Sequence, residues 1–163
     1  MTTLTWTDDL ALGQPRMDAT HVEFVDLLAT LEAALDTAPE APAAVAPALA
    51  ALVAHTDAHF AQEDRWMTAL GFAPQNCHAF QHQSVLNVMR EVQRLHATEG
   101  DVALVQRMAG ELAVWFPQHA QMMDATLAET MTLRGYDPET GAMTNPPAPE
   151  AEAITGCGGS SCG

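Results

Sequence analysis

Apolar residues recur at intervals of three and four positions along four stretches of the chain, which is the period of an amphipathic α-helix. This pattern predicts helices over residues 18–35, 47–70, 75–97 and 102–133. Nowhere does an alternation of apolar and polar residues predict a strand. Four amphipathic helices with short connections favour an all-α fold, an up-down-up-down four-helix bundle.

Proline, glycine and aspartate mark the expected helix boundaries. Pro39 and Pro42 interrupt the chain between the first two helices, because a proline inside a helix removes a backbone donor. Gly71 is expected to end the second helix, as glycine commonly does. Asp18 and Asp101 are the expected N-caps of the first and fourth helices, since a carboxylate can accept from the free amides of a first turn.

The two ends of the chain lack the helical period. Residues 1–17 predict an extended N-terminal arm, with anchors onto the bundle at Trp6, Leu10 and Leu12. From residue 136 the chain is rich in Pro, Gly, Ala and Ser, a composition typical of flexible segments. We therefore expect a helical domain over residues 1–135 and a disordered C-terminal tail over residues 136–163.

An excess of acidic residues narrows the range of partners. The 163 residues include 21 Asp and Glu against 6 Lys and Arg, for a formal net charge of −15. Nucleic acid and anionic membrane surfaces both require a basic face, so we expect neither as a partner. The sequence contains no apolar run of about 20 residues, so we do not expect a membrane-spanning helix. The acidic N-terminus lacks the basic start of a signal peptide. These features predict a cytoplasmic protein.

Histidines and a glutamate interrupt the predicted apolar faces. His59 and Glu63 are four residues apart on the second predicted helix, and His78 and His82 are four apart on the third. Residues at this spacing project to one side of a helix, one turn apart. Each pair could hold one metal ion or contribute to two.

His21 and His119 add single histidines to the core-facing sides of the first and fourth helices. Without a shared ligand, each buried histidine would need its own hydrogen-bond partner in an apolar core, so a common metal site is the better explanation. Imidazole with carboxylate suits iron, manganese or zinc. No Glu stands three residues before a His, as in ferritin-like di-iron sites, and the His-Glu-x-x-His motif of zinc proteases is absent.

The order and spacing of these groups resemble the hemerythrin family, in particular the bacterial hemerythrins. The matching motifs are Asp18-x-x-His21, His59-Phe60-x-x-Glu63, His78-x-x-x-His82 and Trp115-x-x-x-His119-x-x-x-x-Asp124. The opening Trp6-x-x-Asp9-Leu10-x-Leu12-Gly13 is also similar to the N-terminal arm of that family. The resemblance covers about residues 4–135.

The resemblance implies a non-haem centre of two iron ions, joined by an oxo or hydroxo bridge and by the carboxylates of Glu63 and Asp124. The histidines that it implies are His78, His82 and His119 at one iron and His21 and His59 at the other. The second iron would keep a position open for O2. The implied function is reversible O2 binding for storage, delivery or sensing, with an oxidase or oxygenase as a transient partner.

An apolar lining would keep water away from such a centre. The expected lining residues are Phe24, Phe60, Trp115, Phe116 and Met122, for each of which ordinary core packing is the alternative role. His55 lies one turn before His59, where it could hydrogen-bond to a ligand from outside or be a half-exposed helix residue.

Two features of the fourth predicted helix depart from regular geometry. Asp124 follows His119 by five residues, which is about 140° of rotation in a regular α-helix. Periodicity alone therefore does not place both residues on one face. Pro117 lies just before His119 and predicts a local kink, or a restart of the helix, at this point.

Two other functions stay open beside O2 binding, although we expect an O2-binding protein rather than an enzyme. A di-iron enzyme of peroxidase-like or nitric-oxide-reducing type would need an acid–base residue at the open iron, and His55 is the visible candidate. An iron storage or repair protein would give a role to Cys157 and Cys162, which could form a reversible disulfide or bind a soft metal. Cys77 is expected to be an ordinary small thiol.

Overall fold

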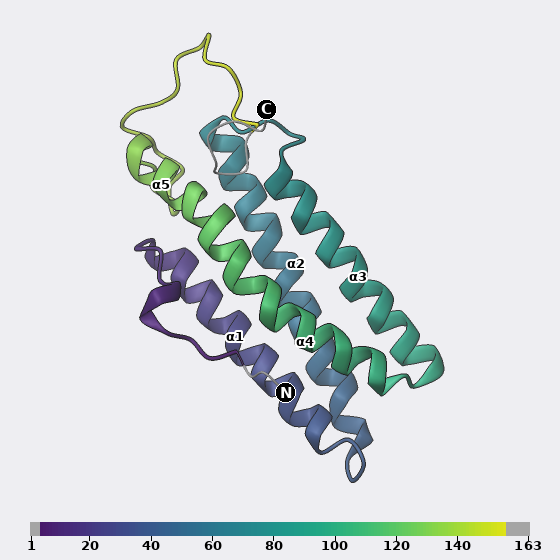
Figure 1. Cartoon of the computed structure of the whole chain (residues 1–163). Coiled ribbons are helices and arrows are strands. Elements are labelled where there is room, and N and C mark those ends of the chain that lie inside the picture. The colour runs from purple at the N-terminus through teal and green to yellow at the C-terminus, as the bar shows by residue number, and fades with distance from the viewer. Residues whose placement is uncertain (1–3, 156–163) are drawn as a thin grey trace.

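Four long helical rods pack side by side along the molecule (Figure 1). The computed structural model describes residues 4–155. The helices are α1 (Pro15–Asp36), α2 (Val45–Leu70), α3 (Cys77–Glu99), α4 (Val102–His119) and α5 (Ala125–Arg134), with a π-helical turn over Ala120–Asp124 between the last two. The predicted all-α bundle is confirmed. Within the described residues, no helix is both long and apolar enough to cross a lipid bilayer.

The start of α1 differs from the prediction. The helix begins at Pro15 and its N-cap is Gln14, whose side chain accepts from a first-turn amide at 2.7 Å. Proline suits this first position because its missing amide would have no partner there. The prediction that Asp18 caps the helix was wrong. Its carboxylate instead accepts from the amides of Leu12 and Gly13, at 2.7 and 3.1 Å, and so ties the N-terminal arm to α1.

The other helix ends lie close to the predicted positions. Gly71 and Gly100 end α2 and α3 in the left-handed conformation, with φ of 91° and 70°. Asp101 caps α4 as predicted, accepting from a first-turn amide at 2.9 Å. α3 starts at Cys77, two residues later than predicted, because Asn76 acts as its N-cap.

The core consists of two apolar clusters with a layer of buried polar side chains between them. The larger cluster, which includes Leu28 and Leu49, fills the end of the bundle at which the chain passes from α1 to α2. The smaller cluster, which includes Met17 and Leu127, fills the opposite end. Apolar side chains therefore close the polar layer at both ends of the bundle.

The N-terminal arm packs on the bundle through the predicted anchors. It contains a short 3-10 helix over Asp8–Leu10. Leu10 is buried, Trp6 packs against the larger cluster and Leu12 packs against the smaller one. The arm thus bridges both ends of the core.

The C-terminal segment contacts the bundle although it has no helix over residues 136–155. Ile154 packs against the smaller apolar cluster. Its amide donates to the carbonyl of Gly71 at 3.0 Å, and its carbonyl accepts from the amide of Ala73 at 2.9 Å. The sequence predicted a disordered tail. Contacts between residues so far apart in the chain leave no periodic pattern from which they could be predicted. The rest of that predicted tail, with Cys157 and Cys162, lies outside the described residues.

Gly135 is expected to tolerate substitution less well than Gly100. Both end a helix with positive φ, 55° and 70°, where a side chain costs roughly 1–2 kcal/mol. A Cβ on Gly135 would also clash with the Thr144 side chain, whereas a Cβ on Gly100 would have no described atom within 4 Å. Gly135→Ala should therefore lower the free energy of unfolding by more than Gly100→Ala does in urea denaturation. Equal losses would contradict a tight contact with Thr144.

Candidate metal centre

Seven ionisable side chains converge in the polar layer between the two apolar clusters. They come from α1, α2, α3, α4 and the π-helical turn, and none is more than 4% exposed. The seven are His21, His59, Glu63, His78, His82, His119 and Asp124. These are the side chains that the sequence predicted as metal ligands. The structure arranges them as two groups that share Glu63.

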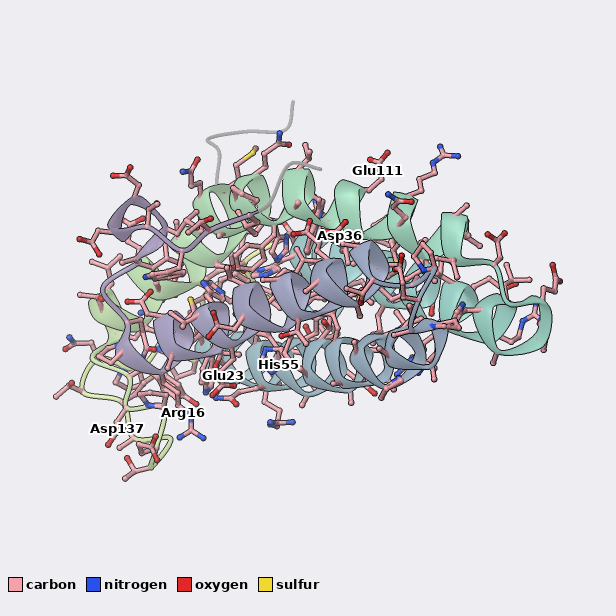
Figure 2. The ribbon with its side chains drawn as sticks, turned by 90° about the horizontal axis from the view of Figure 1, so that it is seen from below. Arg16, Glu23, Asp36, His55, Glu111 and Asp137 are labelled. Carbon is pink, nitrogen blue, oxygen red and sulfur yellow. The ribbon has the colours of Figure 1, made fainter. Side chains whose placement is uncertain are left out.

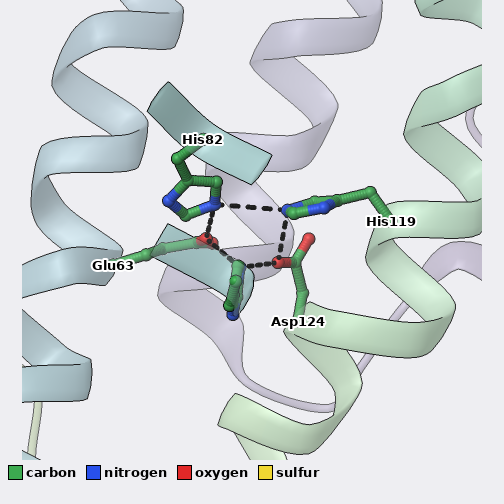
Figure 3. A group of neighbouring side chains, drawn as sticks. Glu63, His82, His119 and Asp124 are labelled. Carbon is green, nitrogen blue, oxygen red and sulfur yellow. Dashed lines mark hydrogen bonds and ion pairs between the residues drawn. The ribbon is translucent and has the colours of Figure 1, made fainter. Parts of the chain in front are cut away.

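One group, the three-histidine group, consists of His78, His82 and His119. Figure 3 shows His82 and His119 beside the carboxylates of Glu63 and Asp124. Glu63 Oε2 lies 3.3 Å from His82 Nε2 and 3.5 Å from His78 Nε2. Asp124 Oδ1 lies 3.0 Å from His78 Nε2 and 3.2 Å from His119 Nε2. Three nitrogens and two oxygens therefore face one small volume.

The other group, the two-histidine group, consists of His21 and His59. Glu63 Oε1 lies 2.9 Å from His59 Nε2 and 3.7 Å from His21 Nε2. Asp124 Oδ2 lies 3.2 Å from His21 Nε2. Each carboxylate thus directs one oxygen to the three-histidine group and the other to the two-histidine group. This is the arrangement expected of carboxylates that bridge two metal ions.

The π-helical turn decides where Asp124 lies. The amide of Ala125 donates to the carbonyl of Ala120, five residues earlier. This wider turn brings His119 and Asp124 to the same side, which a regular α-helix would not do. α4 continues through Pro117, so the irregularity that the sequence assigned to this proline lies three residues beyond it.

Hydrogen bonds within the protein leave several atoms of the cluster unsatisfied. His21 Nε2, His78 Nε2 and both Asp124 carboxylate oxygens are buried without a hydrogen-bond partner among the described residues. Such burial is costly, and a cation held between these nitrogens and oxygens would remove the cost. Imidazole with carboxylate suits a divalent transition metal. The residues present therefore fit a metal centre.

Close packing also shifts the protonation equilibria of the cluster. Burial lowers the pKa of His21 and of His78, but the nearby carboxylates of Asp124 and Glu63 favour the protonated imidazoles, outweigh the effect of burial and raise both pKa values to about 9. Burial likewise opposes ionisation of the two carboxyl groups. The surrounding histidines nevertheless hold the pKa of Glu63 and the pKa of Asp124 below their usual values. Both are therefore anionic at neutral pH and attract a cation.

Two further side chains orient the three-histidine group. His82 Nδ1 lies 3.0 Å from Asp64 Oδ1, and His119 Nδ1 lies 3.1 Å from Gln81 Oε1. If each Nδ1 donates here, the Nε2 atom of each ring is directed to the cluster, as is common behind metal-bound histidines. The sequence did not predict these two residues. Each is adjacent to a ligand candidate in the chain, and nothing in the helical period distinguishes it from a solvent-exposed residue.

Two predicted lining residues cover the three-histidine group. The Phe60 ring stacks on His82 with centroids 4.0 Å apart and planes 4° apart. The Trp115 ring stacks on His119 at 4.4 Å. Phe60 and Trp115 themselves meet edge-on at 6.2 Å. Phe60 and Trp115 together shield His82 and His119 of the three-histidine group.

Of the other predicted lining residues, Phe116 covers the two-histidine group and Phe24 packs against Phe116. Phe116 packs edge-on against His21 at 5.1 Å and stacks with Phe24 at 4.5 Å. The prediction that Met122 lines the pocket was wrong, because Met122 is 61% exposed and Met123 is buried instead. The π-helical turn moves the buried face by one residue relative to the α-helical pattern.

His55 makes no hydrogen bond to a predicted ligand within the described structure. Its Nε2 lies 3.2 Å from the carbonyl oxygen of Thr20, and its Nδ1 lies 3.6 Å from Glu23 (Figure 2). Burial and the charge of His59 lower the pKa of His55. The residue thus connects α2 to α1, and the hydrogen bond to a ligand that the sequence suggested is not made.

Comparisons with known proteins relate the chain to one family. The family model described as Hemerythrin HHE cation binding domain matches residues 12–130, a range that includes all seven side chains of the cluster. A curated bacteriohemerythrin from Ralstonia nicotianae is 39% identical over 137 residues, which cover 84% of this chain and 95% of that protein. No solved structure shows a significant match to the chain.

Loss of one histidine from the cluster should weaken metal binding. In His78→Ala, oxygens of both carboxylates lose a neighbouring nitrogen, so we expect clearly less metal to be retained after gel filtration, measured by elemental analysis. His96→Ala is the matched control, because His96 lies on α3 outside the cluster. Full retention in His78→Ala, or an equal loss in His96→Ala, would contradict the assignment.

Chelator-treated protein should become less stable as the pH rises above neutrality. His21 and His78 have pKa values of about 9 in the fold, against about 6.5 in an unfolded chain. Their protonation therefore stabilises the fold fully below about pH 6.5, and this contribution is lost as the pH rises through about 9. We expect the free energy of unfolding to fall by at most about 3 kcal/mol for each histidine. Urea denaturation at several pH values measures the change, and a flat profile would argue against these ion pairs.

Proposed function

The chain belongs to the hemerythrin family, and on this premise we propose that its cluster holds two iron ions and binds O2 reversibly. The division of the two carboxylates is the observation that carries the proposal. Glu63 and Asp124 each direct one oxygen to each histidine group. A mononuclear site would be satisfied by one group alone, whereas two bridging carboxylates are suited to a metal pair.

The two histidine groups offer unequal numbers of ligand atoms. The three-histidine group supplies three nitrogens and two carboxylate oxygens, while the two-histidine group supplies two nitrogens and two carboxylate oxygens. The metal at His21 and His59 would therefore have one protein ligand fewer, and a small ligand would bind on that side. When bound, two ferrous ions supply the electrons that O2 accepts.

Apolar side chains keep water away from the two-histidine group. His21 is fully buried, and Phe116, which packs against it, and Phe24, which stacks on Phe116, are each 1% exposed. A dry pocket of this kind slows protonation and solvent attack on a bound oxygen ligand. The protein's own contribution to reversible binding is thus to hold the imidazoles in place and to exclude water around them.

An enzymatic function has less support in this site. A di-iron enzyme that reduces peroxide or nitric oxide needs an acid–base group close to the reacting ligand. The candidate from the sequence, His55, faces the carbonyl of Thr20 and the carboxylate of Glu23 instead. Binding of O2 for storage, delivery or sensing is therefore the function that the geometry supports best, and for delivery the partner would be an oxidase or oxygenase.

The reduced, iron-loaded protein should take up one O2 for every two irons and release it when O2 is removed. Optical spectra during cycles of oxygen and argon, together with an iron count, measure both quantities. His21→Ala removes a nitrogen from the two-histidine group and should abolish reversible uptake. The control His96→Ala should bind O2 as the unmodified protein does. Irreversible oxidation at the first exposure, with steady consumption of added peroxide, would favour an enzyme and contradict the proposal.

A further inference from the structure

An apolar groove lies on the surface between α3 and α4. It has a volume of ≈ 520 Å³, and its walls include Val88 and Val92 from α3 and Leu104 and Trp115 from α4. Val88 is 57% exposed. All the described residues that line the groove belong to these two helices. Contiguous apolar surface of this kind commonly marks an interaction site.

One stripe of α4 beside the groove has the spacing with which one helix meets another. Its residues recur at intervals of three, four and three positions and are Leu104, Arg107, Glu111 and Val114. Leu104 is half-buried, and the other three are exposed. Alternating intervals of three and four residues form the seam along which paired helices pack. Beside its core face, α4 therefore presents a second face that is suited to another helix.

Two opposite charges on this stripe restrict its occupant. Arg107 and Glu111 are the only charged residues among those described as lining the groove. Glu111 points away from the bundle (Figure 2). Neither residue forms an ion pair with another residue in the described part of the chain. An occupant that pairs both must place an acid beside Arg107 and a base beside Glu111, one helical turn apart.

A second copy of this chain supplies these two charges in the required order. When two α4 helices pack antiparallel about a two-fold axis at Ala109, Arg107 of each copy lies opposite Glu111 of the other. The same register places Leu104 opposite Val114, so that apolar residues also meet. We propose that the face formed by this groove and this stripe joins two copies of the chain in a symmetric dimer.

The distribution of charge favours this face over the rest of the surface. The chain has a formal net charge of −15, and a large net charge opposes association of like molecules. The groove is lined by one positive and one negative side chain, so repulsion between copies is weakest here. A basic partner would be attracted more strongly to the acidic remainder of the surface than to this balanced face.

The dimer would also cover part of the metal centre. Trp115 lines the groove and is half-buried, and its ring stacks on His119 at 4.4 Å. A second copy seated on the groove excludes water from the outer side of this ring. The proposal rests on the groove and the stripe alone and does not depend on O2 binding.

Sedimentation equilibrium of the full-length protein, with a thiol reductant to exclude intermolecular disulfides, tests the dimer. The mass should rise with concentration from 17.4 kDa to twice that value. In Arg107→Glu, two acids face each other at both symmetric contacts, so the dissociation constant should rise at least about ten-fold. Arg94→Glu, which makes the same change of charge outside the groove, is the matched control and should dimerise normally. A monomer at every concentration, or equal weakening in both variants, would overturn the proposal.

A mixing experiment tests the antiparallel register. The stripe of Arg107→Glu has two acids and no base, and the stripe of Glu111→Arg has two bases and no acid. Each variant alone should be mainly monomeric. An equimolar mixture should form a mixed dimer with a dissociation constant near that of the unmodified protein, because every acid then faces a base. This recovery also shows that both variants are folded. A mixture that stays monomeric, or full dimerisation of either variant alone, would overturn the proposed pairing.

Discussion

The burial of two carboxylates and five histidines between two apolar clusters is the constraint on which the rest of this structure depends. Each of these groups is almost completely removed from water, and unpaired burial of this kind is costly. Contacts between the groups offset part of this cost, because the bundle places them in one layer where each carboxylate contacts histidines of both groups. The unsatisfied nitrogens and oxygens that are left define the place for a cation.

The local geometry of the fourth rod follows from the same constraint. A π-helical turn is uncommon and often marks a functional site. Here it lies between His119 and Ala125 and allows Asp124 to reach the cluster from the same side as His119. Met122 is consequently turned to solvent and Met123 is buried. The position of one carboxylate thus changes which residues of this helix belong to the core.

Contacts outside the cluster hold its histidines in place. Asp64 and Gln81 lie behind His82 and His119, and aromatic rings cover both histidine groups. In the C-terminal segment, Ile154 forms backbone hydrogen bonds with Gly71 and Ala73, which lie in the connection between α2 and α3. α3 itself supplies two of the five histidines, His78 and His82.

The sequence by itself determined the four helical stretches and six of the seven cluster residues, because the helical period and the spacing of His59, Glu63, His78 and His82 are local properties of the chain. Asp124 was predicted by resemblance and not by period. The tertiary structure alone decided which carboxylate oxygen faces which histidine group, and that Asp64 and Gln81 orient two rings. These features depend on the distances between helices, and no pattern within a single helix encodes them.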